Sequence, residues 1–233
     1  MKMPDDNDCD KDKFSREMHL KALLGDQAVD SFELELFEWY AKETDDLLEK
    51  SLHEEIEYLN KQYGSGYDYE CINDSGIMAV EYYAKRIRGS HAIYLTSLLE
   101  TFLKRSCSRL ECAIGTQNLP LSLSKIKGNQ WEKKRKFLEE CGGFSVPDAI
   151  WSEVHALILI RNNLVHDNGE TCALNEEFKI LIASKIGVSI ERSEIAIEKE
   201  YINHAFDVMK SLFSYIDEQI KGVIKNLSSS SSV

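Results

Sequence analysis

Residues 93–103 read Ile-Tyr-Leu-Thr-Ser-Leu-Leu-Glu-Thr-Phe-Leu, and this stretch decides the fold. In a helix it places Tyr94, Leu98 and Phe102 on one face, with further apolar residues beside them. That much apolar surface is typical of a helix at the centre of a bundle. We therefore predict a long helix over residues 77–113, with Gly89 and Ser90 as the place for a bend.

Helical spacing of apolar residues continues on both sides of this stretch, and only three prolines interrupt 233 residues. A shorter segment over residues 186–198 partly alternates apolar and polar residues, which predicts a small β-hairpin. The fold class that follows is all-α, an antiparallel helical bundle with a minor hairpin. The other predicted helices cover residues 31–63, 130–140, 147–166 and 199–226.

Four segments are expected along the chain. They are a disordered acidic arm over 1–14, an N-terminal helical extension over 15–76, a helical bundle over 77–226 and a Ser-rich tail over 227–233. No apolar run approaches the roughly 18–20 residues that span a bilayer. Residues 1–13 are acidic and polar, unlike a secretory signal. We therefore expect a cytoplasmic protein with no membrane partner.

The formal net charge is −12, which on its own argues against a nucleic-acid partner. The distribution of charge is more informative than the total. Residues 85–136 hold 12 basic and 3 acidic side chains, a net of +9, while both flanks are acidic. We call residues 85–136 the basic segment. Such a local excess of Lys and Arg keeps a nucleic-acid partner open despite the negative total.

The most specific motif is Ile-Arg-Asn-Asn-Leu-Val-His-Asp at residues 160–167, followed by an Asn-Gly pair that predicts a helix end. One interpretation is structural, with Arg161 and His166 placed near the last carbonyls of the helix. Glu100 lies among apolar residues and, if buried, needs a cation, for which Arg161 is the obvious candidate. Asn162 and His166 nearly share a face, whereas Arg161 and His166 lie about 140° apart around an ideal helix. Their convergence requires the reach of Arg161, a loosened last turn or a second chain.

The pattern from Arg161 to His166 resembles the R-x4-6-H signature of HEPN (higher eukaryotes and prokaryotes nucleotide-binding) domains, including the polar residue after the arginine. The segment from Glu100 to Arg105 looks like the E-x3-K-R motif of many ribonuclease members. The order also matches, since the acidic motif precedes the Arg–His motif. The resemblance covers residues 77–226 in helix order.

The resemblance implies a bundle that dimerises with two Arg–His motifs facing each other. It further implies a metal-independent endoribonuclease acting as a toxin or in antiviral defence, with an antitoxin or regulatory partner. We expect no cofactor, because the sequence contains no phosphate-binding loop and no dinucleotide-binding motif. By the same resemblance Arg161 and His166 are catalytic, Asn162 supports them, and Glu100 orients one of them. Lys104 and Arg105 then assist in binding RNA.

Two further groups are candidates for RNA binding. His91 follows the cluster Lys85-Arg86-Ile-Arg88, with a partly exposed helix residue as the alternative interpretation. Lys133 and Lys134 belong to a run of four basic residues after Trp131, which is otherwise a solvated helix face. His155, in the apolar helix before the Arg–His motif, is interpreted as a core histidine.

Two hypotheses without catalysis stay open. In the first, the same fold is a binding or regulatory bundle, Glu100–Arg161 is a structural ion pair and His166 caps a helix. In the second, the long acidic first helix is a surface for a partner protein. Cleavage of RNA in the presence of EDTA distinguishes both from a ribonuclease.

Overall fold

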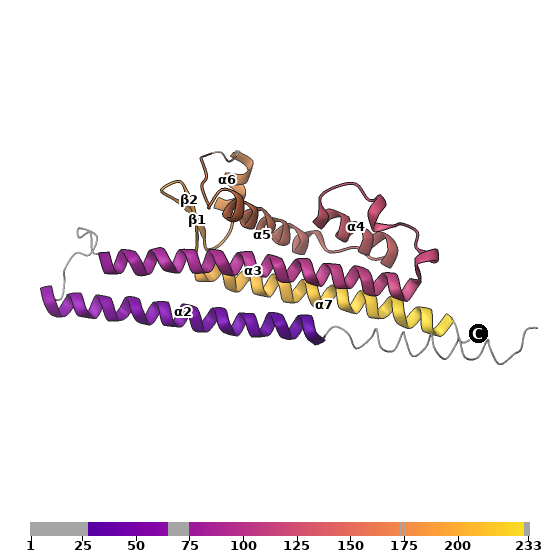
Figure 1. Cartoon of the computed structure of the whole chain (residues 1–233), viewed down its shortest axis with the longest axis horizontal. Coiled ribbons are helices and arrows are strands. Elements are labelled where there is room, and N and C mark those ends of the chain that lie inside the picture. The colour runs from indigo at the N-terminus through magenta and orange to yellow at the C-terminus, as the bar shows by residue number, and fades with distance from the viewer. Residues whose placement is uncertain (1–27, 65–74, 173, 175, 231–233) are drawn as a thin grey trace, which may run out of the picture. The chain divides into compact units, whose positions relative to one another are not determined.

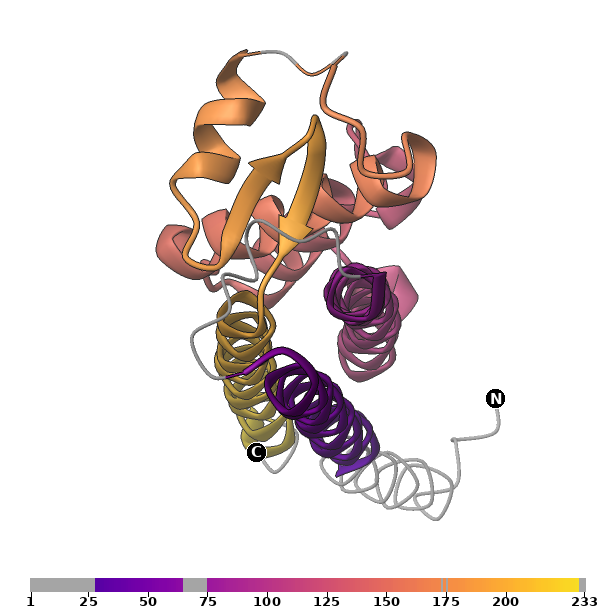
Figure 2. The same ribbon diagram turned by 90° about the vertical axis from the view of Figure 1, so that its left-hand side faces the viewer.

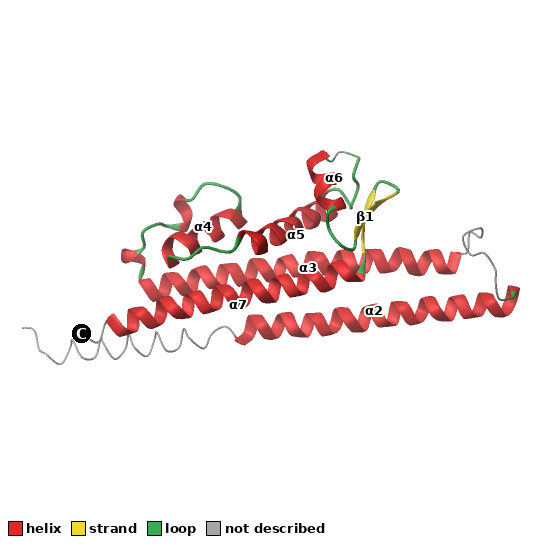
Figure 3. Ribbon diagram, turned by 180° about the vertical axis from the view of Figure 1, so that it is seen from behind, coloured by secondary structure: helices red, strands yellow, loops and turns green. Residues whose placement is uncertain are grey.

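A computed structural model describes residues 28–64, 75–172, 174 and 176–230 of the 233-residue chain. These residues form an all-α bundle with one small hairpin, as predicted (Figure 1). Within the described ranges, the hairpin contains the only strands (Figure 3), and none of the helices is long and apolar enough to cross a bilayer. The helices are α2 (Ala28–Tyr63), α3 (Ser75–Ile114), α4 (Gln130–Gly142), α5 (Asp148–His166), α6 (Glu176–Ala183) and α7 (Lys199–Ser230), and the strands are β1 (Val188–Glu191) and β2 (Glu194–Ile197).

The chain divides into two compact units. Unit 1 comprises Met1–Glu33, Leu98–Trp151 and Met209–Val233, and unit 2 comprises Leu34–Ser97 and Ser152–Val208. The division runs through α2, α3, α5 and α7, so each unit contains parts of the same four helices. The boundaries at residues 14, 76 and 226 stay predictions.

The core of unit 1 is built around the α3 stretch that decides the fold. Phe102 of α3 stacks on Phe213 of α7, with ring centroids 3.7 Å apart. Beside this stack, Arg109 donates a hydrogen bond to Asp217 at 2.8 Å. Burial of such aromatic and aliphatic side chains is the main favourable contribution to folding. Further buried side chains of unit 1 are Leu99, Leu103, Leu110, Phe137, Leu138, Leu212 and Ile216.

The buried face of α3 differs from the predicted one. Leu95, Leu99 and Phe102 are fully buried, whereas Tyr94 is 49 % exposed. The prediction that Tyr94 lies on the central face is therefore wrong. In unit 2 the Tyr94 ring packs at the edge of the core instead, with its centroid 4.3 Å from that of Phe37 in α2.

Unit 2 joins α2, α3 and α7 through one buried cation. Arg88 of α3 donates to Asp45 of α2 at 2.8 Å and to Glu198, just before α7, at 2.9 Å. The side chains of Arg88 and Asp45 are 11 % and 3 % exposed. Next to this network, Phe37 packs against Phe206 of α7 with ring centroids 5.5 Å apart. Unit 2 is thus fixed by a charged network as well as an aromatic cluster.

The hairpin of unit 2 confirms the strand prediction over residues 186–198. Its antiparallel register pairs Val188 with Ile197 and, at the turn, Glu191 with Glu194. The two turn residues, Arg192 and Ser193, have φ values of 48° and 68°. Positive φ at both positions is the geometry of a type I′ turn, which matches the twist of paired strands. Helix α6 lies beside β1 (Figure 2).

Several helix boundaries differ from the predicted ones. Helix α6 was not predicted, although Phe178, Leu181 and Ile182 have helical spacing. Helix α7 continues to Ser230, four residues beyond the predicted end at 226. Helix α3 is uninterrupted at Gly89 and Ser90. The predicted arm over residues 1–14 lies outside the described residues.

The start of α4 offers a direct test of local structure. Asn129 is the N-cap, and its side-chain oxygen accepts hydrogen bonds from the backbone N–H groups of Trp131 and Glu132. We expect Asn129→Ala to lower the free energy of unfolding by about 1 kcal/mol. Urea denaturation of the wild type and the variant measures this loss, and Asn129→Asp serves as the control because it retains the acceptor. Equal stability of all three proteins would contradict the capping role.

Candidate functional site

The Arg–His motif lies in the last two turns of α5, within unit 2. The helix is regular up to His166, and the N–H of Asp167 still donates to the carbonyl of Asn163 at 2.8 Å. Asn168 and Gly169 then have φ values of 51° and 86°, which end the helix. The Asn-Gly stop is confirmed, whereas a loosened last turn is not what the structure has.

A buried residue that was not predicted as a site residue, Asn163, holds this helix end in place. Asn163 is 3 % exposed and donates to the carbonyl of Glu170 at 2.8 Å and to the Asp167 carboxylate at 3.3 Å. Its backbone carbonyl also accepts from the N–H of Gly169 at 3.3 Å. The two adjacent Asn residues of the motif point in different directions on a helix, which is the sequence signal for two separate roles. Asn162 faces outward, and Asn163 closes the helix end.

Asn162 and His166 line one groove of about 690 Å³ between α5 and α6. Their spacing puts them on one face of the helix, as predicted from the sequence. His155 and Leu159 continue that face, and Phe178 of α6 contributes to the opposite wall. His155 is exposed, so its interpretation as a core histidine is wrong. His166 is exposed as well, which leaves its imidazole open to solvent.

Arg161 is separated from this groove. It is half-buried and donates from Nη1 to the side-chain oxygen of Asn162 at 3.1 Å. It does not line the groove that holds His166, in agreement with the angle of about 140° between the two positions on a regular helix. One copy of α5 therefore presents Arg161 and His166 on different sides.

The acidic motif of α3 lies in unit 1 and forms its own contacts there. Glu100 is 44 % exposed and pairs with Lys134 of α4 at 3.4 Å. Arg105 pairs with the carboxylates of Asp30 and Glu33, and Lys104 is exposed. The premise that Glu100 is buried and needs Arg161 as its cation is wrong, because Glu100 is partly exposed and pairs with Lys134 within unit 1.

The other two RNA-binding candidates are mostly turned inward. His91 is 4 % exposed, so its predicted exposure is wrong. Its ring packs edge-on against Phe37, with centroids 5.5 Å apart. Lys134 is 8 % exposed and lies over the ring of Trp131, while Lys133 is half-buried. Side chains this buried do not reach a ligand on the surface without rearrangement.

Burial of His91 has a consequence for stability. Loss of solvent lowers the pKa of His91 below its ordinary value of 6.5; nearby Asp45 opposes the shift and Arg88 adds to it. Between that lowered pKa and 6.5 the unfolded chain binds a proton that the folded chain does not. We therefore expect the free energy of unfolding to fall as the pH drops below about 6.5.

The His91→Phe variant isolates this effect, because it keeps an aromatic ring and removes the titrating group. Urea denaturation between about pH 5 and 8 should give a flatter stability curve for the variant than for the wild type. Curves that run parallel across this range would show that His91 does not contribute.

Ion pairs occupy most of the basic segment. Many of the carboxylates come from the acidic flanks, so the local excess of positive charge is largely compensated within each unit. The exposed pairs among them contribute little to stability, whereas Arg88 and Arg109 are buried in theirs. Among the residues that the structure describes, the cations of the basic segment with a carboxylate partner include Lys85, Arg86, Arg88, Arg105, Arg109, Lys134 and Arg135.

The described residues contain no cluster of three or more His, Cys, Asp or Glu side chains placed to hold a metal ion. No family model matches the sequence, and no curated protein and no solved structure matches it either.

Proposed function

We propose that this protein is a metal-independent endoribonuclease that acts as a homodimer, with Arg161 and His166 as catalytic residues. The observation that carries the proposal is the exposure of His166, together with Asn162, in a groove of about 690 Å³ at the end of α5. The motif resemblance supports it independently. Arg161 lies outside that groove in the same chain, which favours a site completed by a second chain.

The chemistry matches these residue types. His166 as a general base takes the proton of the ribose 2′-hydroxyl, and the 2′-oxygen attacks the adjacent phosphorus. The bond from phosphorus to the 5′-oxygen breaks, and His166 of the partner subunit donates a proton to that oxygen. Arg161 stays protonated and holds the non-bridging oxygens as negative charge develops on them. The products are a 2′,3′-cyclic phosphate and a 5′-hydroxyl.

Asn162 and Glu100 have different places in this proposal. Asn162 accepts from Arg161 and lies in the groove with His166, so it orients the arginine next to the substrate. Glu100 pairs with Lys134 in unit 1, so we assign it no part in the proposed reaction. Lys104 is exposed in unit 1 and is available to bind single-stranded or structured RNA.

In the cell, we propose a cytoplasmic toxin or antiviral role, restrained by an antitoxin or another regulatory partner. The test of the function is cleavage of RNA by the wild type in EDTA and its loss in Arg161→Ala and His166→Ala. Equal cleavage by all three proteins, or cleavage by none, would overturn it.

A non-catalytic binding bundle is the second candidate, and a specific observation favours it. Helix α2 exposes Leu36, Trp39 and Leu47 of unit 2 by more than half, and these residues share one side of the helix. An exposed apolar stripe is typical of a protein-interaction surface. Absence of cleavage by the wild type in the same assay would favour this candidate.

A further inference from the structure

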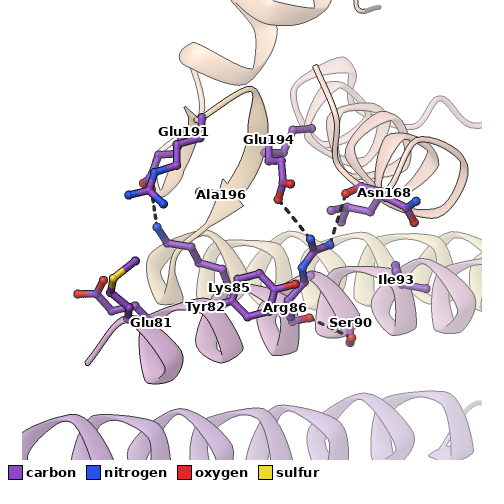
Figure 4. Close-up of a pocket in the computed structure, with 15 residues that line it drawn as sticks. Glu81, Tyr82, Lys85, Arg86, Ser90, Ile93, Asn168, Glu191, Glu194 and Ala196 are labelled. Atoms are coloured by element: carbon purple, nitrogen blue, oxygen red, sulfur yellow. Dashed lines mark hydrogen bonds and ion pairs between the residues drawn. The ribbon is translucent and has the colours of Figure 1, made fainter. Parts of the chain in front are cut away.

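A second groove, of about 490 Å³, lies in unit 2 between the first half of α3 and the hairpin. Its volume is within the range of small-ligand sites. Figure 4 shows Lys85 and Arg86 reaching from α3 towards Glu191 and Glu194 of the hairpin. Lys85 pairs with Glu191, and Arg86 pairs with Glu194 at 3.3 Å.

The helix face explains why these two cations differ from their neighbours. Arg88 and His91 lie three residues apart on the buried side of α3, whereas Lys85 and Arg86 line the groove together with Tyr82. The side chains of Lys85 and Arg86 are 33 % and 45 % exposed. Pairs open to solvent to this extent contribute little to stability, so an incoming anion can replace the carboxylates.

The two carboxylates of the hairpin lie where they repel each other. Glu191 and Glu194 are directly opposite in the register, and like charges in that position destabilise a strand pair. The cations of α3 compensate this repulsion. The hairpin therefore presents two adjacent negative charges to Lys85 and Arg86, as a nucleic-acid backbone would.

The groove also adjoins the proposed catalytic segment. Leu164 and Asn168 line it, and Arg86 donates from Nη1 to the backbone carbonyl of Asn168 at 3.4 Å. Arg161 lies one turn before Leu164 on the same face of α5. A strand held here thus passes the side of α5 that carries Arg161.

We propose that this groove binds single-stranded RNA through its phosphates, and that Glu191 and Glu194 occupy the phosphate positions in the free protein. This inference rests on the proposed ribonuclease function and adds where the RNA substrate is bound. Lys85 and Arg86 bind the backbone, and Tyr82, 54 % exposed, offers a ring for a base. Cations along the backbone combined with an aromatic platform are the usual means of binding single strands.

The experiment measures binding of a fluorescent single-stranded 2′-O-methyl RNA by anisotropy. This ligand lacks the 2′-hydroxyl nucleophile, so binding is measured apart from cleavage. We expect Lys85→Gln with Arg86→Gln to weaken binding roughly tenfold or more, and to make the negative slope of log K against log salt shallower by about 1.4. We expect Glu191→Gln with Glu194→Gln to strengthen binding roughly two- to tenfold.

Matched controls separate these effects from net charge. Lys42 and Lys199 form exposed ion pairs in unit 2 away from the groove, so Lys42→Gln with Lys199→Gln changes the charge equally. Asp46 and Glu49 pair with Lys199, and Asp46→Asn with Glu49→Gln controls for the hairpin variant. Thermal melting of every variant checks that it is folded.

Affinity changes in the groove variants that exceed those of the controls support the groove as the RNA-binding site, whether or not the protein cleaves RNA. Groove variants that bind like their controls, or a wild type that does not bind, would overturn it. If cleavage depends on His166 while binding is indifferent to Lys85 and Arg86, only the groove proposal fails. If the binding pattern holds without any cleavage, only the ribonuclease proposal fails.

Discussion

Replacing His166 by alanine is expected to lower the rate of RNA cleavage by about 10²–10⁴-fold, the usual contribution of a general acid or base. In a homodimer the change removes both proton-transfer groups at once, so we expect a value near the upper end. The measurement is single-turnover cleavage of a labelled RNA at pH 7 in excess EDTA. Because His166 is exposed at a helix end, the variant should fold normally.

Arg161→Ala should cost about 10²–10³-fold in the same assay, as for loss of one group that stabilises transition-state charge. Arg161→Lys keeps the charge but not the planar fork, and is expected to recover only part of the rate. Recovery to the full wild-type rate would instead indicate that only a positive charge is needed at this position.

His155 provides the matched control for both variants. It is exposed and lines the same groove as His166, but it lies three turns earlier on α5, about 16 Å away along the axis. His155→Ala should therefore cleave at close to the wild-type rate. Equal losses in His155→Ala and His166→Ala would mean that the groove binds RNA without His166 having a special role.

The largest expected effect on stability comes from the Arg88 network. Arg88→Met leaves the Asp45 carboxylate, 3 % exposed, without its cation. Removal of one member of a buried ion pair typically costs about 3–5 kcal/mol, because the remaining charge stays desolvated. Urea denaturation at pH 7 should show this loss as a shift of the midpoint.

Lys85→Met is the control for that measurement, on the same helix and one turn earlier. Its ion pair with Glu191 is open to solvent, so we expect a loss of less than about 1 kcal/mol. Similar losses in Arg88→Met and Lys85→Met would contradict the assignment of Arg88 as the buried connection between α2, α3 and α7.

The helices could be predicted because their apolar residues recur over many turns. Helix α3 carries enough of them that its presence was clear, although the exact buried face was not. Leu95 rather than Tyr94 lies at the centre, since a helix that is apolar on several sides does not indicate which side its neighbours cover. Helix α6 has only eight residues, so the helical spacing of its apolar residues extends over too few turns to distinguish a helix from other structures.

The candidate site could be predicted only where it depends on local geometry. Asn162 and His166 share a groove because their spacing on α5 requires a shared face. The partners of Glu100 and the burial of His91 depend on which helices pack together. Lys134 and Phe37, which contact them, are distant in sequence, and the charge of a segment does not reveal how its side chains are paired.

The most direct test of the central claim is the chemical nature of the RNA ends. Wild type and His166→Ala, purified in the same way, are incubated with one RNA in EDTA, and the products are analysed by mass spectrometry. We predict that the wild type cleaves the RNA to give 2′,3′-cyclic phosphate and 5′-hydroxyl ends. The same cleavage sites should remain intact in the incubation with His166→Ala. Ends with a 3′-hydroxyl and a 5′-phosphate, or the same products from both proteins, would contradict a metal-independent reaction through His166.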